Sequence, residues 1–516
     1  MVMNDDIYSS TFARIFRGNN LPEVNRNPYP HAVFEEVFDD EFLRNCLREL
    51  KQHLMANFKE TDLFKVFQTT DLANLEESIQ EAHGKVPNLI RLRECLYSSD
   101  FRSFVSKATG AGLLDGAVDC SCNIYTAGCH LLCHDDVIGT RKISYIVYLS
   151  EPDDEWLDTD GGQLELYALS PDGVQPTDSP AITTKPKWNS LVMFEVLPGK
   201  SFHSVREVST TLKTRVSISG WFHVKCVEAL NRHTGSTSTL EQLHSVRVRH
   251  PTRTLSRTTG KAYTYTARDF RRSKLSEWIN PEYLKPESLQ RITQVIDTDG
   301  SVQLFDFLLS HIASETRSKL TREDCRNRRD RDSYNYAVGH GWSVQGPPHI
   351  RRYLSYKPEG RNQQSSSGEL LKTIAENVLE STDFQSWLDA ITGYSCRLLH
   401  SEIRRFRPGL DYTLAHGGKR QHKPEVDVAL CLTSGKSPGV WGSGDVGGFS
   451  CFVPIVTEDG PPDVYEIGEQ NNITSLAPSY NCMSLMKVDS GISDFVKYVS
   501  VFANSSRWDV VARFST

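Results

Sequence analysis

The fold is decided between residues 120 and 224, where the chain reads CSCNIYT (120–126), ISYIVYLS (143–150), GGQLELYAL (161–169), SLVMFEVL (190–197) and RVSISGWFHV (215–224). Each run is short and rich in β-branched and aromatic residues, and turns rich in glycine, proline and aspartate separate the runs. Many short strands at close spacing are typical of a β-sandwich or a β-barrel.

The segment before these strands predicts a helix that packs on them. In NPYPHAVFEEVFDDEFLRNCLRELKQHLMANF (27–58) a short β-like run precedes a long amphipathic stretch. One face of that stretch carries Phe42, Leu43, Cys46, Leu47, Leu50 and Leu54. This spacing predicts an α-helix with one buried face. Residues 1–20 are polar, and we expect a flexible tail there.

The segment after the strands predicts a linker and a second domain. Residues 231–275 lose the strand pattern and become rich in threonine, serine and arginine, which is typical of a linker. Helical patterns follow at SVQLFDFLLSHIAS (301–314) and, after a polar insert near 325–368, at residues 370–392. A second set of short strands runs to the end. The predicted domains are therefore residues 21–230 and residues 276–516.

The two halves share a pattern. GGQLELYA leads to WNSLVMFEVLPGKSFHSVREVS in the first half, and GGFSCFVP leads to YNCMSLMKVDSGISDFVKYVS in the second. Apolar positions and turn residues correspond in both pairs and in the same order. The pattern predicts two copies of one β architecture within an α+β protein.

The composition narrows the class of protein. A chain of 516 residues exceeds the size of one hydrophobic core, so two domains are expected. Its 38% hydrophobic and 24% charged residues and its net charge of -7 imply no global attraction to nucleic acid or to an anionic membrane. The sequence shows no signal peptide and no apolar run long enough for a bilayer. We expect a cytoplasmic and nuclear protein with reduced cysteines.

One constellation has the pattern of an iron site. Non-haem Fe(II) oxygenases hold the metal with two histidines and one carboxylate. His134 and Asp136 in LLCHDD (131–136) lie two residues apart, so on a strand their side chains point the same way. His203 follows a strand and a Pro-Gly turn, which makes it the best third ligand. The sequence therefore predicts a catalytic metal site at His134, Asp136 and His203.

Two further residues complete a site for 2-oxoglutarate. This co-substrate needs a cation for its distal carboxylate, and the planar fork of arginine suits it best. Arg215 lies twelve residues after His203, a spacing that carries the chain around one turn and back along the next strand. Tyr125, on the run before His134, is in a position to donate its phenol to the same carboxylate.

Other interpretations of these segments stay open. Cys120, Cys122, Cys129 and Cys133 lie close to His130 and His134, which allows a structural zinc site. His134 and Asp136 could also be an ordinary hydrogen-bonded pair. The linker is basic and carries interleaved aromatic residues, so it could contact RNA phosphates and bases or could be a solvated connection.

The sequence resembles the eukaryotic prolyl hydroxylases of a small-subunit ribosomal protein, which are related to the yeast termination-and-polyadenylation protein. The resemblance covers most of the chain. It rests on LLCHDD (131–136), DGGQLELY (160–167), FHSVREV (202–208) with the following Arg215, FQTTDL (67–72) and GPPHIRRY (346–353).

The resemblance implies two double-stranded β-helix (jelly-roll) domains with flanking helices, the first catalytic and the second without metal. It also implies Fe(II), 2-oxoglutarate and O2, with ascorbate as a reductant, and 3-hydroxylation of a proline in a ribosomal protein at the decoding centre. The second repeat agrees, because Asp494 aligns with His203 and Gly418 follows His416 where an acid would be needed. The alternatives are a ribosome- or RNA-associated scaffold or sensor, and an oxygenase that acts on nucleic acid or small molecules.

Overall fold

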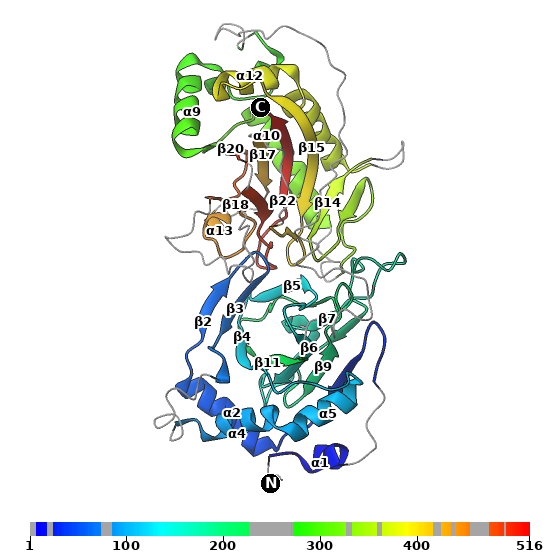
Figure 1. Cartoon of the computed structure of the whole chain (residues 1–516). Coiled ribbons are helices and arrows are strands. Elements are labelled where there is room, and N and C mark those ends of the chain that lie inside the picture. The colour runs from blue at the N-terminus through cyan, green and yellow to red at the C-terminus, as the bar shows by residue number, and fades with distance from the viewer. Residues whose placement is uncertain are drawn as a thin grey trace. The chain divides into compact units, whose positions relative to one another are not determined.

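The chain folds into two compact units in the computed structural model (Figure 1). Unit 1 lies within Met1–Gln242 and includes the short segment Pro347–His349, and unit 2 is the remainder of the described residues after Leu243. The structure describes residues 7–17, 24–73, 85–225, 270, 272–326, 333–358, 364–415, 425–434, 439–454, 474–489 and 492–516. None of the helices within these ranges is long and apolar enough to cross a membrane.

The sheet of unit 1 is antiparallel and has eleven strands. Its order is β1-β9-β6-β11-β4-β3-β5-β10-β7-β8, with β2 paired to β3. The strands are β1 (His31–Phe34), β2 (Asn57–Glu60), β3 (Phe64–Gln68), β4 (Ser121–Tyr125), β5 (His130–His134), β6 (Arg141–Tyr148), β7 (Leu164–Leu166), β8 (Ile182–Thr184), β9 (Leu191–Glu195), β10 (His203–Val205) and β11 (Arg215–His223). This curled antiparallel arrangement is a jelly-roll-like fold, and the strand runs predicted from sequence are confirmed.

Helices cover one face of this sheet (Figure 1). They are α1 (Ser10–Arg17), α2 (Asp40–His53), α4 (Pro87–Tyr97) and α5 (Ser99–Thr109), and the short 3-10 helix η2 (Asp158–Asp160) lies in a loop. The predicted apolar face of α2 is buried from Phe42 to Leu50. These side chains share a core with Ile218 and Phe222 of β11. Because side chains alternate along a strand, Arg215, Ser217, Ser219 and Trp221 of β11 point away from the helices.

Unit 2 has an eight-stranded antiparallel sheet in the order β12-β20-β17-β22-β15-β14-β13, with β16 paired to β14, and a three-stranded sheet β19-β18-β21. The strands are β12 (Ser301–Leu304), β13 (Trp342–Gln345), β14 (Arg351–Tyr356), β15 (Arg397–Phe406), β16 (Tyr412–Thr413), β17 (Glu425–Thr433), β18 (Ser450–Pro454), β19 (Thr474–Leu476), β20 (Cys482–Val488), β21 (Ile492–Val496) and β22 (Arg507–Ser515). The helices are η3 (Lys274–Glu277), η4 (Pro281–Leu284), α9 (Pro286–Asp299), α10 (Ser310–Arg326), α11 (Ser366–Ile374), the π-turn η6 (Ala375–Leu379), α12 (Thr382–Thr392) and α13 (Gly439–Gly442).

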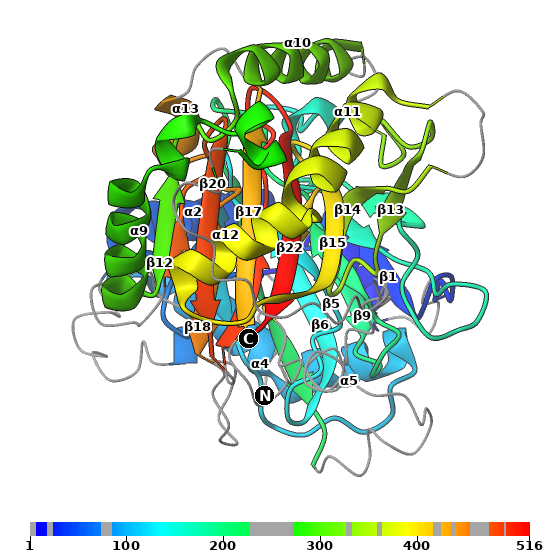
Figure 2. The same ribbon diagram turned by 90° about the horizontal axis from the view of Figure 1, so that it is seen from above.

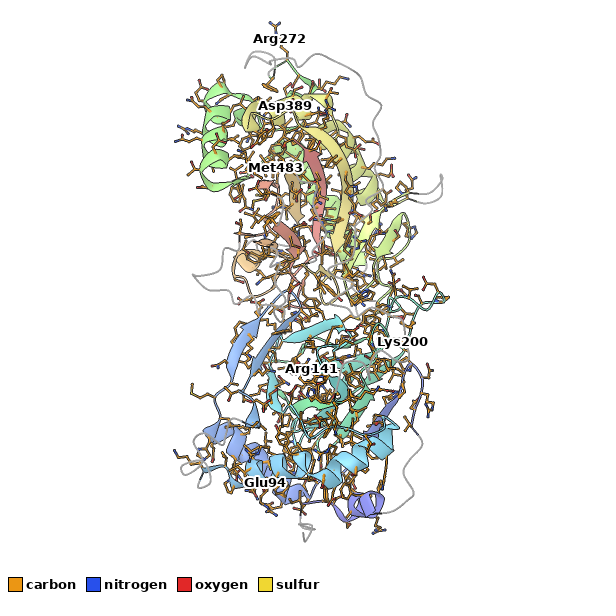
Figure 3. The ribbon with its side chains drawn as sticks, in the orientation of Figure 1. Glu94, Arg141, Lys200, Arg272, Asp389 and Met483 are labelled. Atoms are coloured by element: carbon orange, nitrogen blue, oxygen red, sulfur yellow. The ribbon has the colours of Figure 1, made fainter. Side chains whose placement is uncertain are left out.

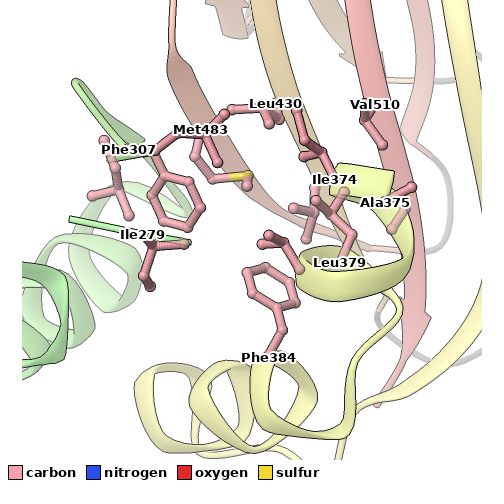
Figure 4. Close-up of a cluster of buried hydrophobic side chains, with 14 of the residues drawn as sticks. Ile279, Phe307, Ile374, Ala375, Leu379, Phe384, Leu430, Met483 and Val510 are labelled. Atoms are coloured by element: carbon pink, nitrogen blue, oxygen red, sulfur yellow. The ribbon is translucent and has the colours of Figure 1, made fainter. Parts of the chain in front are cut away.

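The core of unit 2 lies between α12 and the strands behind it (Figure 2). Phe384 of α12 and Leu379 of η6 pack with Leu430, Met483 and Val510 from three neighbouring strands (Figure 4). The sheet therefore buries one face under helices, as the sheet of unit 1 does.

The structure corrects the predicted boundaries. The expectation of a flexible tail is wrong for residues 7–17, because they form α1 and Phe12 is fully buried against Phe34 and Phe104. The linker ends earlier than residue 275, because Phe270 and Leu275 belong to the core of unit 2.

The prediction of a polar insert near residues 325–368 is also wrong. It contributes β13 and β14 to the large sheet, and its Trp342, Leu354 and Tyr356 belong to the core. The helix predicted from residue 301 begins only at Ser310, since SVQL forms the edge strand β12. The single helix predicted over 370–392 is broken at Ser381, whose hydroxyl accepts a hydrogen bond from Phe384 N and caps α12.

Candidate metal centre

Three predicted ligands meet where β5 and β10 pair. His134 ends β5, His203 begins β10, and the two are direct partners in the antiparallel register. Asp136 follows two residues after β5, and its Oδ1 lies 3.0 Å from His134 Nε2 while its Oδ2 lies 3.3 Å from His203 Nε2. One ligand atom from each residue lies within 4.8 Å of the others, so a single ion could contact all three.

The two imidazoles are oriented by the backbone. His134 Nδ1 lies 2.8 Å from Leu132 O, and His203 Nδ1 lies 2.8 Å from Ser201 O. When each Nδ1 carries the proton and donates to its carbonyl, each Nε2 presents a lone pair to the centre. Two neutral imidazoles and one carboxylate, all nearly buried, are the donor set that Fe(II) takes in oxygenases. The residues therefore fit the metal.

The backbone conformation directs the side chains of Asp135 and Asp136 to different partners. Asp136 has a φ of 61°, a left-handed conformation that aspartate tolerates better than most residues. Asp135 points to the turn before β10, where its Oδ2 accepts a hydrogen bond from Gly199 N at 3.0 Å. Ser201 Oγ also donates to Asp135 O at 3.0 Å. These bonds fasten the strand end that carries His134 to the turn that carries His203.

The centre attracts positive charge. Burial by itself would raise the pKa of Asp136, but His203 and His134 hold that pKa well below its usual range. Burial would lower the pKa of His134, but the Asp136 carboxylate raises it. The buried carboxylate thus favours positive charge beside it, and a bound dication would supply that charge.

Arg215 is a buried cation without a counterion among the described residues. It is 1% exposed, and its Nε donates to Gly162 O at 2.8 Å. Its other nitrogens make long contacts of 3.4 Å with the hydroxyls of Ser217 and Tyr148. No carboxylate within the described ranges lies at ion-pair distance from it. Burying an unpaired charge is costly, so this arrangement indicates a site for an anionic ligand.

Tyr125 and an apolar wall enclose this guanidinium. Tyr125 is the strand partner of Arg215, and the guanidinium carbon lies 4.7 Å from the centre of its ring. Burial raises the pKa of Tyr125 to about 12, so its phenol stays protonated and can donate. Trp156, Val205 and Val208 pack in the same cluster. The guanidinium therefore lies in apolar surroundings, which strengthen an ion pair formed there.

The comparisons with known proteins agree with this geometry. Residues 120–223 match the 2OG-Fe(II) oxygenase superfamily, and residues 271–516 match the family described as oxoglutarate and iron-dependent oxygenase degradation C-term. The chain is 59% identical over 526 residues to prolyl 3,4-dihydroxylase OGFOD1 of Ostreococcus tauri, with 100% of both chains covered. The chain belongs to the OGFOD1 family.

Other relatives extend the comparison. Prolyl 3-hydroxylase OGFOD1 of Xenopus laevis is 29% identical over 92% of this chain and 83% of its own length. Among solved structures, a prolyl-4-hydroxylase of Pseudomonas putida aligns with 38% of this chain and 92% of its own, at 20% identity and a TM-score of 0.25. Membership of the OGFOD1 family makes this chain a 2-oxoglutarate-dependent dioxygenase that uses Fe(II) and O2.

The zinc alternative finds no support in the described residues. Cys120, Cys122, Cys129 and Cys133 are buried and form no disulfide with the described residues. Within the described ranges, one group of three side chains could hold a metal ion, and it consists of His134, Asp136 and His203. These cysteines are small core residues of the OGFOD1 fold.

Two polar contacts of the site were missed by the sequence reasoning. Tyr148 of β6 contacts Arg215, and Trp221 Nε1 donates to Asp136 Oδ2 at 2.9 Å. The even spacing from Arg215 to Trp221 on one strand would have placed both on the same face. His416, Gly418 and residues 231–269 and 271 of the basic linker lie outside the described residues.

Proposed function

We propose that this OGFOD1-family chain hydroxylates a proline of a small-subunit ribosomal protein at ring carbon 3. In this proposal His134, Asp136 and His203 hold Fe(II), and Arg215 holds the distal carboxylate of 2-oxoglutarate. The observation that carries the catalytic assignment is the unpaired, buried guanidinium of Arg215 in the same unit as the buried triad. The names of the relatives support proline as the target, and the sequence resemblance supports the ribosomal protein.

When bound, Fe(II) would supply the oxidising chemistry, in which a proline C–H becomes C–OH while 2-oxoglutarate and O2 yield succinate, CO2 and the inserted oxygen atom. The chain supplies position and environment. The carbonyls of Leu132 and Ser201 fix the imidazole tautomers, and Arg215 fixes the co-substrate end remote from the metal. The apolar wall of Trp156, Val205 and Val208 keeps water from the ion pair.

A second hydroxylation is the other candidate outcome. The full-length relative that is 59% identical is named a prolyl 3,4-dihydroxylase, whereas the relative that is 29% identical is named a prolyl 3-hydroxylase. Higher identity over the whole chain favours addition of a second hydroxyl at ring carbon 4 of the same proline. Product mass separates the two, because each hydroxylation adds one oxygen atom.

We also propose that unit 2 is a non-catalytic copy of unit 1. The order β12-β20-β17-β22-β15-β14-β13 repeats β1-β9-β6-β11-β4-β3-β2 of unit 1. Arg507 begins β22 as Arg215 begins β11, and it donates to Gly448 O as Arg215 donates to Gly162 O. These parallels support a common architecture.

Chemistry separates the two copies. Asp494 pairs with Phe452 across β21 and β18, where His203 pairs with Leu166 in unit 1, so an imidazole is replaced. Asp509, two residues after Arg507, is fully buried and lies 2.9 Å from its guanidinium. At the corresponding place in unit 1 stands neutral Ser217. An internal carboxylate thus occupies the arginine that would otherwise receive a co-substrate.

The decisive experiment is mass spectrometry of the ribosomal protein after incubation with the wild-type chain or with His134→Ala. We expect one or two added oxygen atoms on a proline, dependent on 2-oxoglutarate and abolished in the variant. Metal analysis of the loaded chain should give one iron per chain. If the enzyme is loaded with iron and the ribosomal protein stays unmodified, that protein is not the substrate. This result would favour the alternatives, a ribosome- or RNA-associated scaffold or an oxygenase of nucleic acid.

A further inference from the structure

The strand that carries Arg215 also carries a contact to the metal centre. On β11 the residues at odd positions from Arg215 to Trp221 face away from the helices, so both side chains point into the same interior. At one end of this face, Arg215 lies in the pocket proposed for the co-substrate. At the other end, Trp221 Nε1 donates to Asp136 Oδ2 at 2.9 Å.

The orientation of the Asp136 carboxylate depends on its hydrogen-bond partners. Its backbone has left β5 and adopts a φ of 61°, so no strand pairing holds the side chain in register. Oδ1 faces His134 alone, at 3.0 Å. Oδ2 faces His203 at 3.3 Å and also accepts the bond from Trp221. The two oxygens are therefore unequal, and the indole N–H occupies a lone pair of one of them.

A cation lies on the indole ring. The guanidinium carbon of Arg141 lies 3.5 Å from the centre of the Trp221 ring, and Arg141 itself lies among the strands of unit 1 (Figure 3). Arg141 Nε lies 3.8 Å from Asp119 Oδ2, which holds the guanidinium over the ring. A cation on an aromatic face withdraws electron density from it and limits its rotation. Asp119, Arg141, Trp221 and Asp136 thus form one chain of contacts that ends at the metal centre.

We propose that Trp221 is a positioning residue for the metal ligand Asp136, and that Arg141 supports it. The N–H of Trp221 donates to Oδ2, so Asp136 would offer one oxygen to the metal. Without this bond the carboxylate is free to turn and to bind through both oxygens. This inference rests on the proposed metal centre. Hydrogen-bond partners behind metal ligands commonly contribute 10- to 100-fold in metal affinity.

The test compares two tryptophans that make the same kind of contact. Trp188 Nε1 donates to Asp40 Oδ1 at 2.8 Å, with the guanidinium of Arg44 5.7 Å from its ring centre, and Asp40 belongs to the surface of α2. Trp221→Phe and Trp188→Phe therefore each remove one indole-to-aspartate bond. Mn(II) binding is measured by titration of the full-length metal-free chain, and the visible absorption of the Co(II)-loaded chain reports coordination.

We expect Trp221→Phe to weaken Mn(II) binding about 10- to 100-fold and to change the Co(II) spectrum, with Trp188→Phe like the wild type. Arg141→Met, which leaves both tryptophans, should weaken Mn(II) binding about 2- to 5-fold. Equal Mn(II) affinity and equal Co(II) spectra for both Trp→Phe variants would overturn the inference. If Trp221→Phe does not fold, Arg141→Met decides, and unchanged affinity there overturns it. Failure of the wild type to bind Mn(II) would instead refute the proposed metal centre.

Discussion

Replacement of Arg215 by methionine separates a ligand-binding arginine from a structural one. Methionine keeps most of the length and apolar volume of the side chain and removes its charge. In the wild type Nε is committed to Gly162 O, and the contacts of 3.4 Å with Ser217 and Tyr148 leave the other two nitrogens available for a carboxylate. Loss of one partner of a buried charge pair costs about 2–5 kcal/mol. This corresponds to a weakening of 2-oxoglutarate binding by about 30- to 4000-fold.

The same substitution should not destabilise the protein without co-substrate. It loses the hydrogen bond to Gly162 O, which contributes about 1 kcal/mol, and the contacts with two tyrosine rings. It also removes an uncompensated buried charge, whose desolvation costs several kcal/mol. We therefore expect an unchanged or higher melting temperature for Arg215→Met in the absence of 2-oxoglutarate.

The assay is thermal unfolding of the Mn(II)-loaded chain over a titration of 2-oxoglutarate. At a co-substrate concentration 100 times the wild-type Kd the wild type gains about 2.7 kcal/mol, and Arg215→Met should gain less than about 1 kcal/mol at that concentration. The matched control is Arg507→Met, which removes one of the two guanidiniums that pair with buried Asp509 and leaves that of Arg404, and it should destabilise the chain by about 1.5–3 kcal/mol with normal 2-oxoglutarate affinity. An undiminished affinity in Arg215→Met, or a loss of apo stability as large as in Arg507→Met, would refute the reasoning.

Three further outcomes are expected. Chelation of the metal should lower the melting temperature of the wild type and Mn(II) should restore it, because a ligand that binds the folded state stabilises it. His134→Ala lacks one of the three metal ligands, so its melting temperature should show neither change. Glu402→Gln should destabilise unit 2 by about 3 kcal/mol at neutral pH, since burial opposes ionisation but His400 and Arg404 hold the pKa of Glu402 at about 2. A carboxyl group with a depressed pKa stabilises the folded state above about pH 4.5, and this stabilisation is lost as the pH falls towards 2. The difference in unfolding free energy between the wild type and Glu402→Gln, measured by denaturation across this window, should therefore shrink. A constant difference would contradict the assignment. Gly220→Ala should destabilise unit 1 by about 2–4 kcal/mol in denaturant melts, because a Cβ there would lie 1.7 Å from Asp119 O; a wild-type midpoint would show that the strands can part.

The elements that recur with a simple period were predictable. Alternation along β11 and the pairing of two strand ends brought His134, Asp136, His203, Arg215 and Tyr125 into one unit, because a period of two fixes which face each side chain takes. The helix α2 followed from its apolar spacing in the same way. Such patterns depend on local geometry, which the sequence carries directly.

The contacts that depend on irregular backbone were not predictable. Trp221 contacts Asp136 only because residue 136 takes a left-handed conformation after the strand. The residue types around position 136 do not predict that conformation. The strands β13 and β14 were hidden in a polar stretch, since Trp342, Leu354 and Tyr356 supply apolar faces between charged neighbours. Helix α1 is only eight residues long, and its burial depends on aromatic rings distant in sequence.

The pairing of Arg507 with Asp509 bears on inhibition. Small dicarboxylates that imitate 2-oxoglutarate need an arginine whose nitrogens are available, and those of Arg507 already bond to Asp509, Gly448 O and Ser450 Oγ. Such compounds should therefore titrate as a single site per chain, with a hyperbolic dose response and no second, weaker phase. Chemical probes built on that scaffold would report on unit 1 alone, while ligands for unit 2 would have to be sought among molecules without a carboxylate anchor.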